Sequence, residues 1–234
     1  MPGRRKKIWI TRAQPGADST AERVRGMGHD ALVAPLLTVR RLEDVEIDLS
    51  DVGALAFTSA NGVRAFAELS GDRKLRVYAV GGATAQAARA AGFSSVLSAD
   101  GGVEALAHGI AARRGELNGV VLHAGAAELA ADLIGLLEAR CVPARRLVLY
   151  ETQAEPPDEV RTRRLLKADA VLLHSPKAAR VLAKLLRAHP TPQLRVLGLS
   201  PAVLKPLARI KLAAKAAPPY PLEAALLQLI DRDG

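Results

Sequence analysis

The sequence is poor in aromatic residues and almost free of cysteine. Of its 234 residues only 3% are aromatic, and the one cysteine is Cys141. A single cysteine excludes an intramolecular disulfide and any CxxC motif, and it fits a reducing compartment such as the cytoplasm. The scarcity of aromatic side chains argues against single-stranded nucleic acid as a ligand, because such ligands are usually stacked on aromatic rings.

Long apolar runs are also missing. No stretch approaches the roughly 18 consecutive apolar residues that a membrane-spanning helix needs. The first residues, MPGRRKKIWITRAQ, are basic, but their apolar run covers only Ile8, Trp9 and Ile10, which is too short for the core of a signal peptide. We therefore expect a cytoplasmic protein with no membrane partner.

Familiar catalytic and cofactor motifs are absent as well. The chain contains no Walker A, HExxH or GxSxG motif, and VGGAT is not the GxGxxG of dinucleotide-binding proteins. Its five histidines are scattered without the spacing of metal ligands. We therefore predict no metal and no other cofactor. For Cys141 the simplest expectation is a buried, inert thiol.

What the chain does have is apolar and basic residues. It is 49% hydrophobic and carries a formal net charge of +9, so it can bury a core and should attract an acidic partner. Nucleic acid, an anionic membrane and a polyanionic small molecule all remain open on charge alone. The length suits one large domain or two small ones.

Short apolar runs alternate with amphipathic segments along the whole chain. GALAFTS, for example, resembles a buried strand and ANGVRAFAELSG, which follows it, a helix. This alternation predicts an α/β fold with parallel sheets covered by helices on both faces. Pro35 interrupts the strand-like run ALVAPLLTV, so that run fits an edge strand or a linker better than a central strand.

One strand–helix unit occurs twice. FTSANGVRAF contains Ser59 and Arg64, and LHSPKAARVL contains Ser175 and Arg180 at the same mutual spacing. A repeat of this length predicts two duplicated domains rather than a solenoid. The simpler alternative is that any two strand–turn–helix units look alike.

Ligands of open parallel sheets bind beyond the carboxyl ends of the strands, where loops enter helices. Most residues at these junctions are small or carry a hydroxyl group, which suits contact with carboxylates at helix N-termini. For each Ser or Thr alone, a plain helix cap is the simpler role. The six junctions are Thr11-Arg12-Ala13, Thr58-Ser59-Ala60-Asn61, Gly81-Gly82-Ala83-Thr84, His123-Ala124-Gly125, His174-Ser175-Pro176 and Gly198-Leu199-Ser200.

The ordered set TRA, FTSANGVRAF, AVGGATAQAARAAGF, VLYET and LLHSPKAARVL resembles the uroporphyrinogen-III synthase family over nearly the whole chain. The resemblance implies two similar, flavodoxin-like α/β domains, joined by a two-stranded connector, with a ligand cleft between them. Domain one would comprise residues 1–36 and 153–234, and domain two residues 40–149. The linkers would be about residues 37–39 and 150–152.

The resemblance also implies a reaction. The family's substrate is hydroxymethylbilane, a linear tetrapyrrole with eight carboxylates, which is cyclised to uroporphyrinogen III with loss of water and inversion of ring D. The family uses no cofactor, and we expect a monomer. A polycarboxylate substrate matches the basic charge of the chain. The alternative is a non-catalytic two-lobed protein that binds a small polyanion, because a fold alone does not separate the two.

By the same resemblance, Tyr150 is the candidate proton donor to the departing hydroxyl group. The residues carried over as anion contacts or loop formers are Arg12, Thr58, Ser59, Asn61, Gly81, Thr84 and Ser175. The junction GLSPAV departs from the family pattern: Ser200 keeps a hydroxyl group and a cap, but Pro201 has no N–H to donate. Lys177 stands where the first repeat has Asn61, and its charge could compensate.

Overall fold

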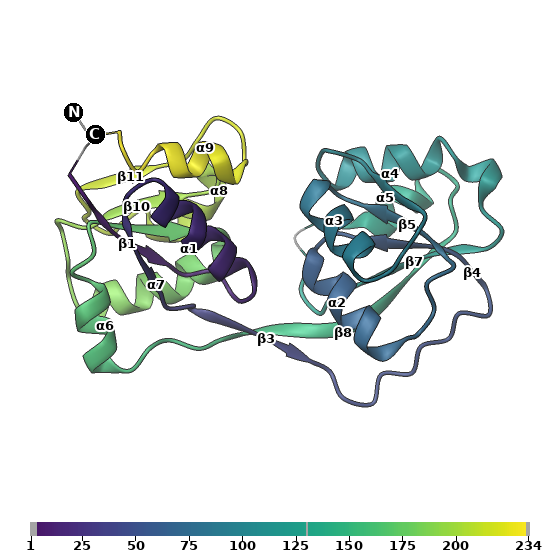
Figure 1. The fold of residues 1–234 in the computed structure, drawn as a ribbon, viewed down its shortest axis with the longest axis horizontal. Coiled ribbons are helices and arrows are strands. Elements are labelled where there is room, and N and C mark those ends of the chain that lie inside the picture. Colours follow the sequence, from purple (N-terminus) through teal and green to yellow (C-terminus); the bar gives the residue numbers. More distant parts are fainter. Residues whose placement is uncertain (1–3, 130, 233–234) are drawn as a thin grey trace. The chain divides into compact units, whose positions relative to one another are not determined.

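The computed structural model describes residues 4–129 and 131–232. The chain divides into two compact units, which are treated separately below (Figure 1). Unit 1 comprises Met1–Thr38 and Gln153–Gly234, and unit 2 comprises Val39–Thr152. Each unit contains one sheet whose strands alternate with helices along the chain, as the sequence pattern predicts.

The sheet of unit 1 has the strand order β11-β10-β9-β1-β2, and each neighbouring pair is parallel. Its strands are β1 (Lys7–Ile10), β2 (Asp30–Val33), β9 (Ala170–Leu173), β10 (Arg195–Gly198) and β11 (Ala214–Ala216). β9 is buried along its whole length, because helices cover both faces. The edge strand β2 ends before Pro35, so the prediction of an edge at this run is confirmed.

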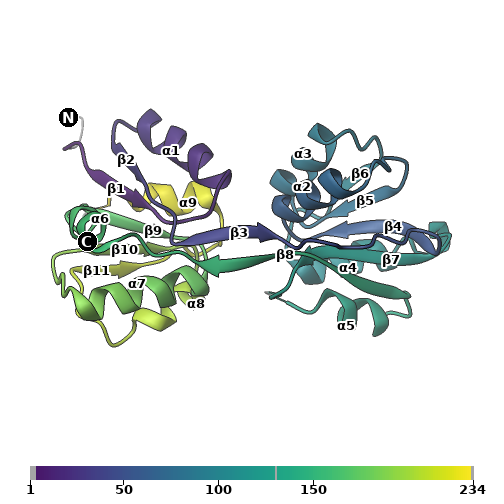
Figure 2. The same ribbon diagram turned by 90° about the horizontal axis from the view of Figure 1, so that it is seen from below.

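Two helix layers enclose this sheet (Figure 2). One face packs against α1 (Gly16–Gly26) and α9 (Glu223–Gln228), and the other against α7 (Pro176–Ala188), α8 (Pro201–Leu204) and α6 (Glu159–Leu165). The side chain of Trp9 packs between the sheet and the second of these helix layers, with none of its surface exposed. Its indole Nε1 donates a hydrogen bond of 2.8 Å to the carbonyl of Ala34.

Two helical segments of unit 1 are short. In the run PAVLKPLARIK, α8 gives way to a short 3-10 turn, Lys205–Leu207, that contains Pro206. Proline has no N–H with which to continue an α-helical ladder. The helix α6 has the mostly polar sequence EVRTRRL, which gives no clear apolar signal of a helix.

The sheet of unit 2 has the strand order β3-β8-β7-β4-β5-β6. Its strands are β3 (Leu37–Arg41), β4 (Val52–Phe57), β5 (Arg76–Ala79), β6 (Val96–Ser98), β7 (Val120–Ala126) and β8 (Ala144–Ala154). The pairs β8–β7, β7–β4, β4–β5 and β5–β6 are parallel.

β3 and β8 form the connector. The amide of Leu42 donates to the carbonyl of Leu149, and the amide of Glu155 donates to the carbonyl of Leu36. The partner number falls as the residue number rises, so the two strands run antiparallel. Both strands continue past the unit boundary, which lies between Thr38 and Val39 in β3 and between Thr152 and Gln153 in β8.

The helices of unit 2 also cover both faces of its sheet (Figure 2). α2 (Ala60–Leu69) and α3 (Gly82–Ala90) pack on one face, and α4 (Val103–Ala111) and α5 (Leu133–Glu138) on the other. The aromatic core of the first face consists of Phe57, Phe66 and Phe93, whose ring centroids lie 5.8–6.4 Å apart.

The prediction for Cys141 is wrong. This residue is exposed and has a backbone φ of 55° in the turn between α5 and β8. The positive φ is typical of a tight turn, and in this turn the side chain points away from the core.

Candidate active site

The junction between β4 and α2 is built around Ser59. Ser59 is the N-cap of α2, and its hydroxyl oxygen accepts a hydrogen bond of 3.2 Å from the amide of Gly62. The same oxygen lies 2.8 Å from the phenolic oxygen of Tyr150. Ser59 is therefore the helix cap that its position predicts, and it also holds the candidate proton donor.

Gly62 allows this arrangement because α2 approaches β7 closely. A Cβ atom at Gly62 would lie 2.8 Å from the carbonyl oxygen of Ala124, a distance that real side chains do not adopt. The glycine in FTSANGVRAF therefore fixes how near the start of α2 comes to the sheet.

Tyr150 lies inside β8 and not at its end, because β8 continues to Ala154 along its partner β3. The apolar run RRLVLY predicts a strand that ends at Tyr150, and the structure corrects this. Only 5% of the residue is exposed. Burial raises the pKa of the Tyr150 phenol, and the hydrogen bond with Ser59 offsets part of that effect. The phenol therefore keeps its proton at neutral pH and can donate it.

Thr58 and Ser59 directly follow the end of β4 at Phe57, and their side chains have different partners. Ser59 pairs with Tyr150 on the α2 side, whereas the Thr58 hydroxyl lies 3.1 Å from Nε2 of His123. His123 has no exposed surface. Burial and the nearby charge of Arg146 lower the pKa of His123 to about 4, although Asp132 acts in the opposite direction. The imidazole is therefore neutral at physiological pH.

The remaining unit 2 residues lie at the same edge of the sheet or in the first turns of its helices. β4 pairs with both β5 and β7 in parallel register, which places Gly81 at the same edge as Thr58. Gly81 is the N-cap of α3 and has no side chain to accept the first amides of that helix. Thr84 is buried in the first turn of α3. The Asn61 side-chain oxygen accepts a hydrogen bond of 3.2 Å from Arg64.

In unit 1 the junction after β1 is organised by an ion-pair cluster. Arg12 Nη1 donates to Glu223 Oε1 at 3.0 Å and to the Thr20 hydroxyl at 3.3 Å. Arg23 Nη1 donates to Glu223 Oε2 at 2.8 Å. The guanidinium of Arg12 lies over Gly16, where a Cβ atom would be only 2.6 Å from Arg12 Nε. Arg12 is thus held in place from two sides, with 34% of its side chain exposed.

Glu223 is the centre of this cluster. Burial would raise its pKa, but the contacts with His174 and Thr20 and the charge of Arg12 outweigh burial and bring the pKa of Glu223 to about 2. Nε2 of His174 lies 3.5 Å from Glu223 Oε1, which is too long for a well-formed hydrogen bond. The pKa of His174 is lowered, chiefly by burial, so this ring is neutral at physiological pH.

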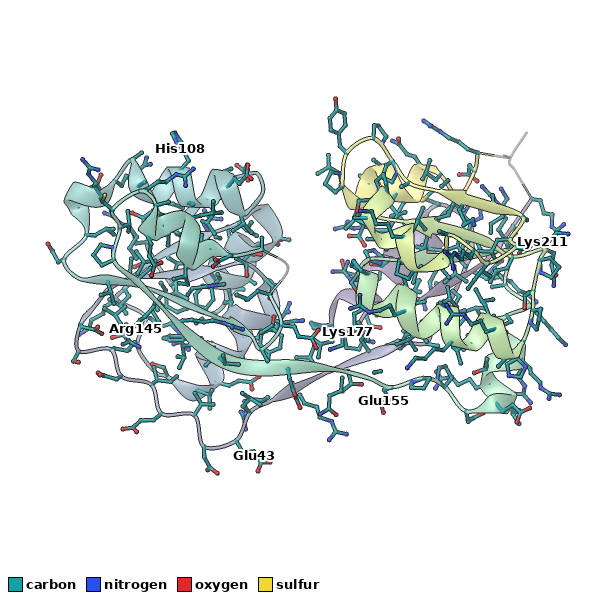
Figure 3. The ribbon with its side chains drawn as sticks, turned by 180° about the vertical axis from the view of Figure 1, so that it is seen from behind. Glu43, His108, Arg145, Glu155, Lys177 and Lys211 are labelled. Carbon is teal, nitrogen blue, oxygen red and sulfur yellow. The ribbon has the colours of Figure 1, made fainter. Side chains whose placement is uncertain are left out.

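The second copy of the strand–helix unit repeats the first in detail. Ser175 caps α7 and accepts a hydrogen bond of 3.2 Å from the amide of Ala178, the same bond that Ser59 makes with Gly62. Lys177 follows in the first turn of α7 (Figure 3). Ser200 occupies the N-cap position of α8, but its side chain makes no capping hydrogen bond, so the cap predicted for Ser200 is not formed.

These neighbours lie at the carboxyl edges of two parallel sheets, where ligands of such sheets bind. The sequence matches the family model described as Uroporphyrinogen-III synthase HemD over residues 18–228. The chain belongs to the uroporphyrinogen-III synthase family. Members are cyclising hydro-lyases of haem biosynthesis, and their substrate is a tetrapyrrole. The function inferred from the ordered motifs is therefore confirmed, and nothing favours the non-catalytic alternative.

Solved structures agree in fold. The uroporphyrinogen-III synthetase of Helicobacter pylori 26695 is 16% identical with a TM-score of 0.69, over 97% of this chain and 98% of that one. A mutant uroporphyrinogen III synthase of the extreme thermophile Thermus thermophilus is also 16% identical, with a TM-score of 0.53 over the same shares of both chains. No curated protein sequence matches this chain at a significant level.

This synthase has no cluster of three or more potential metal ligands within residues 4–129 and 131–232. In the same part of the chain, no helix is both long and apolar enough to cross a membrane. His108, which is exposed, projects outward from α4, away from the carboxyl edge of the sheet (Figure 3).

Sequence reasoning missed Glu223 in the synthase. It pairs with Arg12, 211 residues earlier in the chain, and no local pattern reports a contact of that range. The only local sign is its position in the first turn of α9, where an acidic residue is also explained by the helix dipole.

Proposed function

We propose that Tyr150 is the proton donor in the cyclisation of hydroxymethylbilane and that the junction residues bind the carboxylates of this substrate. The observation that carries the proposal is the pairing of the half-buried Ser59 with the buried Tyr150, with 2.8 Å between their oxygens. A neutral phenol fixed by a helix cap is oriented before the substrate arrives.

The chemistry needs orientation and one proton. Loss of the hydroxyl group from ring A gives an electrophilic azafulvene, with electrons supplied by the pyrrole nitrogen. The substituted carbon of ring D attacks, and the resulting spiro intermediate opens and recloses with ring D reversed. Positioning accounts for much of such a reaction. A general acid that protonates the departing hydroxyl group typically contributes 10²–10⁴-fold.

Substrate carboxylates have several suitable partners in this chain. The first turns of α2, α3 and α7 offer backbone N–H groups next to Ser59, Gly81 and Ser175, and helix N-termini attract anions. Because Gly81 has no side chain, it leaves the amides at the start of α3 to a ligand. We assign further contacts to Thr58, Asn61, Thr84, Lys177 and Ser200.

Arg12 is the proposed cationic contact of unit 1. Its partner Glu223 occupies one edge of the guanidinium through Nη1, and an arginine has five N–H donors in total. The remaining donors can serve a substrate carboxylate in a charge-assisted bond. Glu223 then acts as a positioning residue that fixes the direction in which Arg12 points.

We also propose that the enzyme acts as a monomer in the cytoplasm and does not bind nucleic acid. The exposed thiol of Cys141 supports a reducing compartment. The low aromatic content supports the absence of single-stranded nucleic acid among its ligands. Gel filtration at several concentrations tests the monomer, and a concentration-dependent shift to twice the mass contradicts it.

The proposed function is tested with freshly prepared hydroxymethylbilane. Products are oxidised and the type I and type III isomers are separated by chromatography. The bilane cyclises unaided to the type I isomer, so an enzyme-free sample gives the background. We expect mainly type III product with the wild type and a sharply lower rate with Tyr150→Phe. Type I product alone contradicts the activity, and wild-type turnover by Tyr150→Phe contradicts the assignment of Tyr150.

A further inference from the structure

His123 is a buried titratable residue of unit 2 to which the mechanism above gives no role. It lies on β7 opposite Ala56 of β4, two residues before Thr58. Its side chain has no exposed surface, and Nε2 lies 3.1 Å from the Thr58 hydroxyl oxygen. Its other ring nitrogen, Nδ1, is buried and has no hydrogen-bond partner among the described residues.

The two charged groups that act on His123 are engaged elsewhere. Arg146 donates to the carbonyl oxygens of Ala126 and Ala127. Asp132 caps α5 and accepts a hydrogen bond of 3.0 Å from the amide of Gly135. Neither group therefore supplies a partner for Nδ1, and the net effect of burial and charge keeps the ring neutral.

A neutral imidazole carries its single proton on one of its two nitrogens. If that nitrogen were Nδ1, a buried N–H group would have no acceptor, which is rare and costly in native proteins. If it is Nε2, the N–H group donates to Thr58, and only an acceptor lone pair at Nδ1 stays unpaired. Buried unpaired acceptors are tolerated more often than buried unpaired donors.

We infer that His123 carries its proton on Nε2 and donates a hydrogen bond to the Thr58 hydroxyl oxygen. This bond directs the Thr58 O–H toward the substrate as a hydrogen-bond donor. Thr58 is half-buried at the carboxyl edge of β4, and a hydroxyl group whose oxygen already accepts one bond has its own proton free to give. His123 is then a positioning residue for a carboxylate contact. The contact between Thr58 and the substrate rests on the proposed function, whereas the tautomer of His123 does not.

The tautomer is measured directly by long-range ¹H–¹⁵N correlation spectra of the uniformly labelled full-length protein at pH 7. The signals of His123 are those missing from the spectrum of the His123→Gln variant. We expect the pattern of a neutral ring protonated on Nε2. A ring protonated on Nδ1, or on both nitrogens, overturns the inference whatever the enzyme does with the bilane.

Steady-state kinetics with hydroxymethylbilane test the role of Thr58. Thr58→Val should raise KM roughly tenfold, the effect of one hydrogen bond to a charged group, with little change in kcat because the contact binds ground and transition states alike. His123→Leu should raise KM in the same way. His123→Gln places an amide N–H near the position of Nε2 and should restore a KM close to that of the wild type.

The double variant His123→Leu/Thr58→Val separates positioning from general damage. If His123 acts through Thr58, the double variant has the KM of Thr58→Val alone. Multiplying effects, or an unchanged KM in His123→Leu, overturn the inference. His108→Leu on the exposed side of α4 is the matched histidine control and should leave KM unchanged. Thermal midpoints identify a variant that is merely misfolded, and the tautomer spectrum of the wild type then decides.

Discussion

The hydroxyl oxygen of Ser59 lies 2.8 Å from the phenolic oxygen of Tyr150 while it accepts the amide proton of Gly62. One side chain thus joins the start of α2 to a buried phenol on β8. Ser175 caps α7 with a bond of the same length. The two serines therefore share one structural role, and Ser59 has the contact with Tyr150 in addition.

This difference gives a matched pair of variants. Ser59→Ala and Ser175→Ala should each lower the free energy of unfolding by about 1 kcal/mol, because each removes one helix cap. Only Ser59→Ala should also lower kcat, roughly tenfold, since Tyr150 loses its orienting partner. Ser175→Ala should act on KM instead. Denaturant melts and single-turnover rates check both, and equal kcat values in the two variants would contradict an orienting role for Ser59.

Tyr150→Phe removes one oxygen and keeps most of the packing of a residue that is only 5% exposed. A purely structural hydroxyl group should cost about 1 kcal/mol in stability and little in rate. A general acid should cost roughly 10²-fold or more in kcat with the fold intact. We expect the second outcome. Single-turnover kinetics are measured beside the thermal midpoint, and a loss of stability without a loss of rate removes Tyr150 from the mechanism.

Glu223→Gln should loosen both arginines that Glu223 pairs with, Arg12 and Arg23. We expect a stability loss on the order of 2 kcal/mol at pH 7, between the values for exposed and fully buried ion pairs. KM should rise several-fold with kcat nearly unchanged. Glu22→Gln on the exposed side of α1 serves as the control. A wild-type KM in Glu223→Gln would separate Glu223 from substrate binding.

The decrease in the free energy of unfolding at low pH should depend on the carboxylate of Glu223. The folded protein holds the pKa of Glu223 at about 2, below its ordinary value of 4.5. A lowered folded-state pKa contributes stability above the ordinary value, and that contribution is lost as the pH falls from about 4.5 to about 2. Glu223→Gln should lack this component, so the two proteins should converge in stability over that window. Parallel curves down to pH 2 would contradict the assigned pKa.

Two glycines of α1 distinguish a steric effect on Arg12 from a general effect of alanine on stability. A Cβ atom at Gly16 would lie 2.6 Å from Arg12 Nε, whereas one at Gly26 would meet nothing within 4 Å. Gly16→Ala should displace Arg12 and raise KM several-fold. Gly26→Ala should leave KM unchanged and stabilise the protein by up to about 1 kcal/mol, because alanine lowers the entropy of the unfolded chain. A KM that changes in Gly26→Ala but not in Gly16→Ala would contradict the placement of Arg12 over Gly16.

Features with a local signal could be predicted from the sequence. The alternation of apolar runs and amphipathic segments indicated the parallel α/β sheets, and the hydroxyl groups of Ser59 and Ser175 marked two helix starts that the structure contains. Pro35 marked the end of an edge strand. Each of these depends on a few neighbouring residues.

Features that depend on pairing between distant segments could not be predicted. The register of β4 against β7 brings His123 to Thr58, and the position of α9 brings Glu223 to Arg12. Tyr150 lies within its strand only because β8 extends along β3. The helix α6 escaped prediction because it is short and mostly charged, so it shows no clear apolar period.

The burial of Trp9 has a consequence for how this synthase can be watched as it unfolds. Trp9 is the only tryptophan of the chain and lies in the core of unit 1, with its indole N–H bonded to Ala34. Intrinsic fluorescence excited at the tryptophan band therefore reports on one unit alone, while circular dichroism records both. Coincident melts by the two signals mean that the units lose structure together, and separated melts mean that unit 2 unfolds as a body of its own.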